Sequence, residues 1–177
     1  AAQGGFDVTP DLTTLGKASG AGFPVGAVGG RGEIMDQMAP AGPVYQAGTL
    51  SGNPIAMRAG LTALECLTDT SVYEALESTS NAFADALTSE AKSAGIPIHT
   101  SVVGGMFGFY FSESPVDSCE GAEACDHERF AAFFHGMLEA GVYLPPSPFE
   151  ACFNSTVHGD PEVEHFRAAA SAVMKSL

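Results

Sequence analysis

One lysine of this sequence stands in a setting suited to covalent chemistry. The other two, Lys92 and Lys175, lie near the ends of expected helices, where a solvated charge that complements the helix dipole is a sufficient role. Lys17 lies in a glycine-rich stretch with apolar flanks, residues 15–27. Glycines let the backbone approach a bulky group closely, and a dry setting favours the neutral amine, which attacks an aldehyde to form a Schiff base. The alternative interpretation is a surface lysine on a glycine turn.

Other chemistries that use similar residues fail on spacing. The lysine is followed by Ala18 rather than Ser or Thr, and no glycine stands five residues before Gly16, so the P-loop pattern is absent. The pair His127-Glu128 lacks the second histidine of the zinc motif H-E-x-x-H. Three glycines after the lysine miss the dinucleotide pattern G-x-G-x-x-G by one residue, and these are Gly20, Gly22 and Gly26. The histidines without ligand-like spacing are His99, His135, His158 and His165.

The elements that must position Lys17 are short strands and turns. The first part of the chain holds much of the glycine and shows little helical periodicity. Residues 12–15 are expected to end a short strand and residues 23–28 to form a buried strand, with the lysine between them. Asn53-Pro54 then supplies the N-cap and first turn of a helix that ends near Thr68. The expected apolar face of this helix consists of Leu61, Leu64 and Leu67.

The second part of the chain alternates helices with short strands. Apolar residues at spacings of three and four predict a helix over residues 72–94, which Gly95 terminates. Residues 96–103 and 106–111 are expected to form two strands joined at Gly104-Gly105.

Two more helices complete the expected elements. One ends at Gly141, and the other begins at Asp160-Pro161. The succession of strands on glycine turns and a helix, strand, strand, helix unit indicates a mixed α/β architecture. The expected apolar faces are Phe130, Phe133, Phe134, Met137 and Leu138 in the first helix, and Val163, Phe166, Ala170 and Val173 in the second.

The composition excludes several classes of partner. The formal net charge is −14, from 21 acidic and 7 basic residues, so nucleic acid and anionic membranes are not expected partners. The sequence has no apolar run of about 20 residues that could span a bilayer. The 4 cysteines form no C-x-x-C pair, which favours reduced thiols in a cytoplasmic compartment. The opening in loop-like composition, without methionine, leads us to expect a piece of a longer protein.

Several separated blocks resemble one enzyme family. Residues 15–27 are similar to the lysine segment of class III aminotransferases, and residues 45–54 to the Gly-Thr…Gly-Asn-Pro segment that follows it in that family, in the same order and at the same separation. Residues 40–49, 103–108 and 141–151 resemble the aminomutase branch of the family, so that the resemblance spans nearly the whole chain. The departures are Ala21, where the family usually has a third glycine, and Cys152, where glycine is common.

The resemblance implies a pyridoxal-phosphate-dependent transferase fold, α/β and aspartate aminotransferase-like (fold type I). Residues 1–70 would be the C-terminal portion of the cofactor-binding large domain, and residues 71–177 the C-terminal small domain. Lys17 would hold pyridoxal 5′-phosphate, which alternates with pyridoxamine 5′-phosphate, and would move protons at the C4′ atom of the cofactor and at the substrate carbon. Gly48 and Thr49 would donate an amide and a hydroxyl to the phosphate of the cofactor in the neighbouring subunit. That arrangement implies a homodimer.

The resemblance also bears on the substrate and the reaction. Glu150 follows a proline-rich loop, and its carboxylate could hold the amino group of a small-molecule substrate or tune proton transfer if the loop folds over the site. The resemblance to the aminomutase branch favours such a substrate-side role over the alternative, a solvated loop acid. The family's phosphate loop, stacking aromatic and ring-pairing aspartate precede the lysine and are not in this chain. The expected reaction is intramolecular amino transfer in the cytoplasm, or in the plastid stroma if the source is photosynthetic. The alternatives are an omega-aminotransferase and, for the isolated chain, a non-catalytic dimerisation domain.

Overall fold

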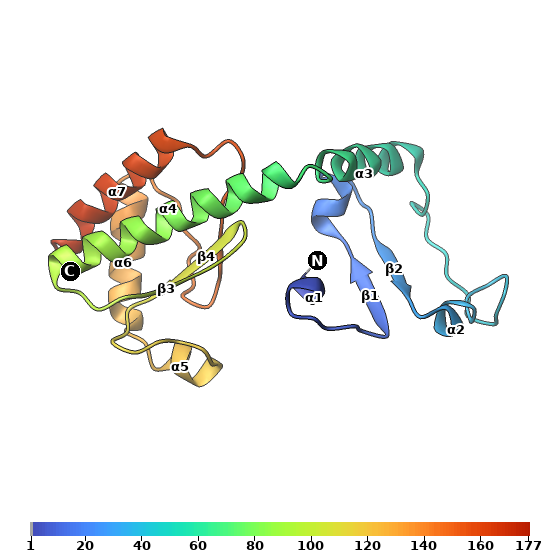
Figure 1. Ribbon diagram of the computed structural model, residues 1–177, viewed down its shortest axis with the longest axis horizontal. Coiled ribbons are helices and arrows are strands. Elements are labelled where there is room, and N and C mark those ends of the chain that lie inside the picture. The colour runs from blue at the N-terminus through green and yellow to red at the C-terminus, as the bar shows by residue number, and fades with distance from the viewer. Residues whose placement is uncertain (1) are drawn as a thin grey trace. The chain divides into compact units, whose positions relative to one another are not determined.

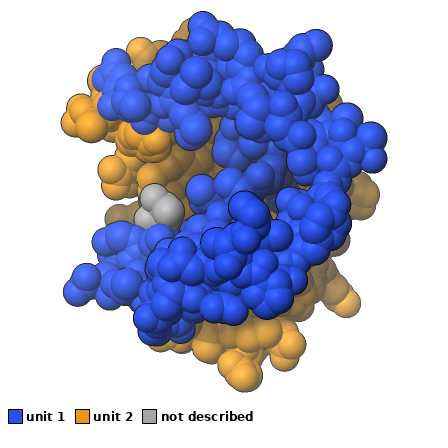
Figure 2. Space-filling model, turned by 90° about the vertical axis from the view of Figure 1, so that its right-hand side faces the viewer, with its two compact units in different colours: residues 1–69 blue, residues 70–177 orange. Residues whose placement is uncertain are grey.

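The computed structural model describes residues 2–177, which form two compact units divided between Asp69 and Thr70. Figure 1 traces the chain, and Figure 2 colours the two units separately. The sequence predicted a domain boundary at residue 70. The assignment of the first unit to a large domain and of the second to a small domain stays a prediction.

The first unit contains a two-stranded sheet and short helices. Antiparallel β1 (Leu12–Leu15) and β2 (Ala27–Gly30) pair from Leu12 with Gly30 to Leu15 with Ala27. The predicted strand over residues 12–15 is confirmed, whereas the strand expected over residues 23–28 begins later, at Ala27, and is exposed rather than buried. The reason is local: the amide of Phe23 donates to Gly20, and the amide of Val25 donates to Phe23, so these residues form turns. The other elements are α1 (Ala2–Gly5), the 3-10 turn η1 (Lys17–Gly20), α2 (Gly32–Met35) and α3 (Pro54–Cys66).

Helix α3 has the predicted cap, whereas its predicted apolar face does not enter a core of this unit. The Asn53 side chain accepts hydrogen bonds from the amides of Ile55 and Ala56 at 3.1 and 3.2 Å, and Pro54 occupies the first turn. Leu61 and Leu64 are 48% and 52% exposed, and Leu67 is partly buried. The buried residues of α3 are instead Ala56 and Gly60, because short side chains allow the helix to pack closely on η1.

The second unit packs helices on a three-stranded antiparallel sheet in the order β3-β4-β5. β3 (His99–Val103) and β4 (Met106–Tyr110) form the predicted hairpin, in which Gly104 takes the left-handed φ of 55° that the two-residue loop requires. The helices are α4 (Thr70–Ala94), α5 (Cys119–Glu123), α6 (His127–Glu139) and α7 (Asp160–Met174), and the third strand is β5 (Cys152–Phe153).

The core of the second unit is rich in phenylalanine. Phe107 and Phe109 are two residues apart on β4 and are both buried, so one face of the sheet is covered by helices. α4 and α7 lie side by side over this core (Figure 1). The predicted range of α4, the predicted end of α6 and the predicted start of α7 agree with the structure to within two residues. α5 and β5 were not predicted because each is too short to show a period. Helical core residues include Phe83, Leu87, Phe130, Phe133, Met137, Phe166, Ala170 and Val173.

Within residues 2–177, no helix combines the length and the apolar character needed to cross a membrane.

Candidate functional site

Lys17 opens a strained turn directly after β1. It is the first residue of η1 and has a left-handed φ of 53°, and Ala21, which caps the turn, has a φ of 50°. Left-handed conformations cost an L-residue roughly 1–2 kcal/mol, and they persist where the surrounding structure holds them. Hydrogen bonds from the amide of Ser19 to Gly16 and from the amide of Ala21 to Ala18 close the turn. The residue predicted to do chemistry therefore stands at a backbone outlier.

The dry setting predicted for Lys17 is not formed by this chain. Lys17 is exposed, and its apolar flanks Leu15 and Phe23 are 53% and 48% exposed. A two-stranded sheet with one helix covers only one side of the turn, where Gly20 is buried. Within residues 2–177, no acidic side chain forms an ion pair with the amine of Lys17. The amine is therefore unpaired and accessible.

Gly48 and Thr49 lie in the same unit, in the turn that leads into α3. The amide of Ser51 donates to Gly48 at 3.0 Å, and the amide of Asn53 donates to Leu50 at 3.1 Å. Among the described residues, none accepts a hydrogen bond from the amides of Gly48 and Thr49 or from the Thr49 hydroxyl, and both residues are exposed. Unpaired amide and hydroxyl donors ahead of a helix N-terminus are the groups that an anion requires.

A hollow of about 620 Å³ links these two segments within the first unit. Leu15, the last residue of β1 before the lysine turn, contributes to its wall, and so does Gly48. Val25, Gln46 and Ser51 also line it. The structure thus brings the strand that enters the Lys17 turn and the Gly48 segment to one hollow. The side chains of Lys17 and Thr49 are not among its lining residues.

Glu150 belongs to the second unit. It is exposed in the loop between α6 and β5, and its amide donates to Ser147 at 3.2 Å. With Ser101 and Tyr110 of the hairpin and its neighbour Phe149, it lines a hollow of about 190 Å³. The predicted substrate-side role of Glu150 stays a prediction.

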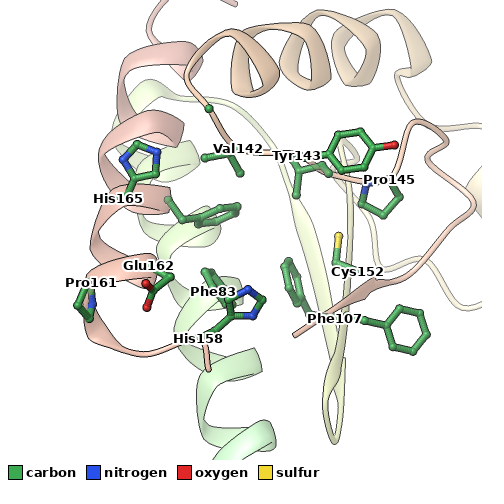
Figure 3. Close-up of a pocket in the computed structure, with 14 residues that line it drawn as sticks. Phe83, Phe107, Val142, Tyr143, Pro145, Cys152, His158, Pro161, Glu162 and His165 are labelled. Atoms are coloured by element: carbon green, nitrogen blue, oxygen red, sulfur yellow. The ribbon is translucent and has the colours of Figure 1, made fainter. Parts of the chain in front are cut away.

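Sequence reasoning missed a pocket of about 390 Å³ in the second unit (Figure 3). Phe83 and Phe107 contribute an apolar wall, and His158, Glu162 and His165 contribute polar groups. Only Glu162 and His165, three residues apart on α7, carried a signal of a shared helix face, whereas His158 precedes the helix. Among the described residues, no group of His, Cys, Asp or Glu side chains is arranged to hold a metal ion.

Hydrogen bonds and burial determine the charges around this pocket. The Gly159 amide donates to Glu162 at 2.8 Å and lowers the pKa of that carboxyl group. The Ser155 amide donates to Nδ1 of His158 at 3.1 Å, which leaves Nε2 as the protonated nitrogen of the neutral ring. Burial raises the pKa of the Cys152 thiol to about 12, so this residue is not a nucleophile at neutral pH.

Solved structures share the fold of nearly the entire chain. An omega-transaminase from Sphaerobacter thermophilus is 30% identical with a TM-score of 0.84, over 99% of this chain and 40% of that one. A beta-phenylalanine aminotransferase from Variovorax paradoxus is 27% identical with a TM-score of 0.85, over 98% of this chain and 40% of that one. A glutamate-1-semialdehyde aminomutase from Pseudomonas aeruginosa PAO1, in complex with PMP, is 18% identical with a TM-score of 0.81, over 99% of this chain and 41% of that one.

These similarities establish the fold and the family of the chain. The mixed α/β chain has the pyridoxal-phosphate-dependent transferase fold of type I, which confirms the predicted fold class. The family model for class-III aminotransferases matches residues 1–152, and the chain belongs to that family. It spans about 40% of the length of the transaminase structures that it matches.

Proposed function

We propose that the intact protein is a pyridoxal-phosphate-dependent enzyme that transfers amino groups, with Lys17 as the lysine that holds the cofactor. The observation that carries this proposal is the accessible, unpaired Lys17 amine at a left-handed turn whose entering strand shares a hollow with Gly48. Membership of the class-III aminotransferase family supports it. When bound, pyridoxal phosphate supplies an aldehyde for amine exchange and a ring that withdraws electrons.

The residues of this chain fit that cofactor in type. Lys17 would supply the amine that holds the aldehyde carbon, and the freed amine would move a proton at the substrate carbon. The amide of Gly48 and the hydroxyl of Thr49 would hold a phosphate, in keeping with their lack of other partners among the described residues. We propose that this phosphate belongs to the neighbouring subunit of a homodimer, as the resemblance implies.

Peptide mapping tests the lysine assignment. The intact protein is loaded with pyridoxal phosphate, reduced with borohydride and digested, and the cofactor-bearing peptide is identified by mass. We expect the cofactor on Lys17, because Lys92 and Lys175 stand at helix ends. Cofactor trapped on either of those two residues would remove the basis of the proposal.

Two reactions use this machinery, and a different observation supports each. The identities of 30% and 27% to two aminotransferases support transfer from an amine or a beta-amino acid to a 2-oxo acid, and this is the function that we place first. The blocks at residues 40–49, 103–108 and 141–151 support the second candidate, glutamate-1-semialdehyde 2,1-aminomutase, which isomerises glutamate 1-semialdehyde to 5-aminolevulinate for tetrapyrrole synthesis. In that reaction Glu150 would hold the substrate amino group.

The number of turnovers separates the two reactions. An aminomutase regenerates its starting form of the cofactor in each cycle and needs no second substrate. The intact protein, charged with pyridoxamine phosphate, is given glutamate 1-semialdehyde without a 2-oxo acid and, in parallel, a beta-amino acid with 2-oxoglutarate. We expect no more than one equivalent of product in the first assay and continued turnover in the second. Many cycles of 5-aminolevulinate formation, slowed by Glu150→Gln, would establish the aminomutase instead.

A further inference from the structure

The Lys17 turn has only a few contacts that hold it in its strained form. Its two left-handed residues, Lys17 and Ala21, are not glycines, and the amide of Ser19 reaches Gly16 at a long 3.4 Å. Strained conformations of this kind persist only where the surroundings determine them. Three of the four η1 residues are at least partly exposed, and Gly20 alone is buried. The contacts that hold the turn in its strained conformation therefore lie on the side of Gly20.

The buried side of the turn packs against α3 at Gly60, the position of the helix that has no side chain. A Cβ atom placed on Gly60 would lie 2.8 Å from the carbonyl oxygen of Ser19 and 3.7 Å from a methyl of Val25. Val25 also meets Gly20 from the other side, where an added Cβ would lie 3.2 Å from the Cβ of Val25. Ala56, one helical turn before Gly60, is buried as well. The turn therefore lies so close to the axis of α3 that a side chain at position 60 would not fit without a shift of the Ser19 carbonyl.

The side chain of Ser19 is enclosed at this turn. The Ser19 hydroxyl is buried, and among the described residues it has no hydrogen-bond partner. An unpaired buried hydroxyl costs about 1–3 kcal/mol, so other contacts of the turn must outweigh this cost. A Cβ atom at position 60 would also lie 3.9 Å from the carbonyl carbon of Ser19. The contact is therefore with backbone atoms, which cannot rotate away as the end of a side chain can.

We infer that Gly60 is a positioning residue for Lys17: its missing side chain lets α3 support the Ser19 carbonyl and so fixes the left-handed start of the lysine turn. This inference rests on the proposed function, because it concerns the reactivity of Lys17 toward the cofactor. A methyl group at position 60 pushes the Ser19 carbonyl outward, and Lys17, two residues earlier in the same turn, moves with it. The higher helix propensity of alanine, about 1 kcal/mol over glycine, offsets part of the cost of this displacement, so we expect the variant to fold.

The test is Gly60→Ala in the intact protein. We expect the rate constant for capture of pyridoxal phosphate by the cofactor-free protein, followed by visible absorbance, to fall about tenfold or more, because small misplacements of a reacting group have large kinetic effects. We also expect the pH profile of the bound-cofactor absorbance to shift and hydrogen exchange to rise in residues 16–25. The thermal midpoint of the cofactor-free protein should fall by only a few degrees, since overpacking costs about 1–3 kcal/mol and the helix propensity of alanine returns about 1 kcal/mol.

Two further variants make the test specific. Gly29→Ala is the matched control, because a Cβ at Gly29 meets nothing within 4 Å, and we expect its capture rate and pH profile to equal those of the unmodified protein. Val25→Ala removes the methyl groups that hold Gly20 and Gly60 together, at a half-buried position that the fold tolerates. It should raise hydrogen exchange in residues 16–25 and slow capture without adding a clash, and it replaces Gly60→Ala if that variant does not fold.

The failures of the two proposals are distinguishable. If reduction traps the cofactor on another lysine in the unmodified protein, the proposed function fails and the role of Gly60 fails with it. If the cofactor is trapped on Lys17, but Gly60→Ala and Val25→Ala capture it at the Gly29→Ala rate with an unchanged pH profile, the proposed function stands and the positioning role is wrong.

Discussion

At the scale of single residues, several polar groups of the first unit have no partner among the described residues. The amine of Lys17 is accessible, and the described residues leave the amides of Gly48 and Thr49 without acceptors. Unpaired polar groups at the surface cost little, because water satisfies them. The amine and the two amides lie in the same unit. We take this as support for the proposed binding of an anionic ligand with an aldehyde group over a purely structural role of these residues.

Thr49→Ala should weaken cofactor retention more than it slows proton transfer. One hydrogen bond to a charged group contributes about 1.5–3 kcal/mol, which corresponds to a rise in the dissociation constant of roughly tenfold to a hundredfold. The rise in the dissociation constant is measured as the loss of cofactor from the intact protein during dialysis. Thr62→Ala, at an exposed position of α3, is the control and should retain the cofactor normally. Equal retention by both variants would show that Thr49 is an ordinary turn residue.

The Cys152 thiol should make the stability of the protein fall in alkaline solution. Burial raises its pKa from 9.0 to about 12, so between these values the unfolded thiol ionises while the folded thiol stays protonated. The contribution of the thiol to the free energy of unfolding is therefore complete below pH 9. It declines as the pH rises and is lower by roughly 2 kcal/mol at pH 10.5.

Denaturation in urea at pH 8 and at pH 10.5 checks this expectation. Cys152→Ala should lose less stability between the two pH values than the unmodified protein, and Cys66→Ala, at an exposed cysteine, should lose as much as the unmodified protein. Equal losses in all three proteins would mean that Cys152 does not determine the alkaline slope.

At the scale of elements, α3 connects the phosphate segment to the lysine turn. Its N-cap follows the Gly48 turn directly, and its buried Gly60 contacts Ser19. One helix thus sets the position of the segment that would hold the cofactor of this subunit and of the segment that would contact the cofactor of the neighbouring subunit. The larger side chains of α3 point away from this contact and remain exposed.

Asn53→Ala should destabilise the start of α3. The Asn53 side chain satisfies two amides of the first turn, and loss of such a cap costs about 1 kcal/mol. Faster hydrogen exchange in residues 54–58 and a lower thermal midpoint are expected. Asn81→Ala in the middle of α4, where the exposed side chain donates to the Glu77 carbonyl of its own helix, should be neutral or slightly stabilising. A normal exchange rate in Asn53→Ala would mean that water replaces the cap.

At the scale of the whole molecule, the two units differ in how much apolar surface they bury by themselves. The second unit has a contiguous core, with Phe133 and Met137 fully buried. The first unit leaves most of its large apolar side chains exposed, including Phe6, Val44, Tyr45, Leu50 and Ile55. A unit that cannot cover its apolar surface depends on other contacts for stability.

Residues 70–177 should therefore fold alone, whereas residues 1–69 should not. Expressed separately, residues 70–177 should unfold in one cooperative transition, and Phe133→Ala should lower the stability of this unit by about 3–5 kcal/mol. Residues 1–69 should show no cooperative transition. Circular dichroism melts of the two segments measure both outcomes, and a cooperative melt of residues 1–69 would contradict the argument from exposure.

Much of the second unit was predictable because its signals are local. The periodic residues of α4, α6 and α7 and the glycines at positions 95, 104 and 141 determine where helices and the hairpin end, within a few residues of the chain. The Asn53 cap is local in the same way. Lys17 could be singled out by its glycine setting, although the setting alone did not place its backbone in the left-handed region.

Tertiary structure alone decided the features that depend on residues distant in the sequence. The leucine row of α3 has the right period for a core, but the close approach of the Lys17 turn requires the small residues Ala56 and Gly60 on the buried side. His158 and Phe83 lie 75 positions apart in the sequence, yet they line one pocket because α7 packs on α4. Short-range patterns determine which elements form, whereas which of their faces become buried depends on the shape and size of what packs against them.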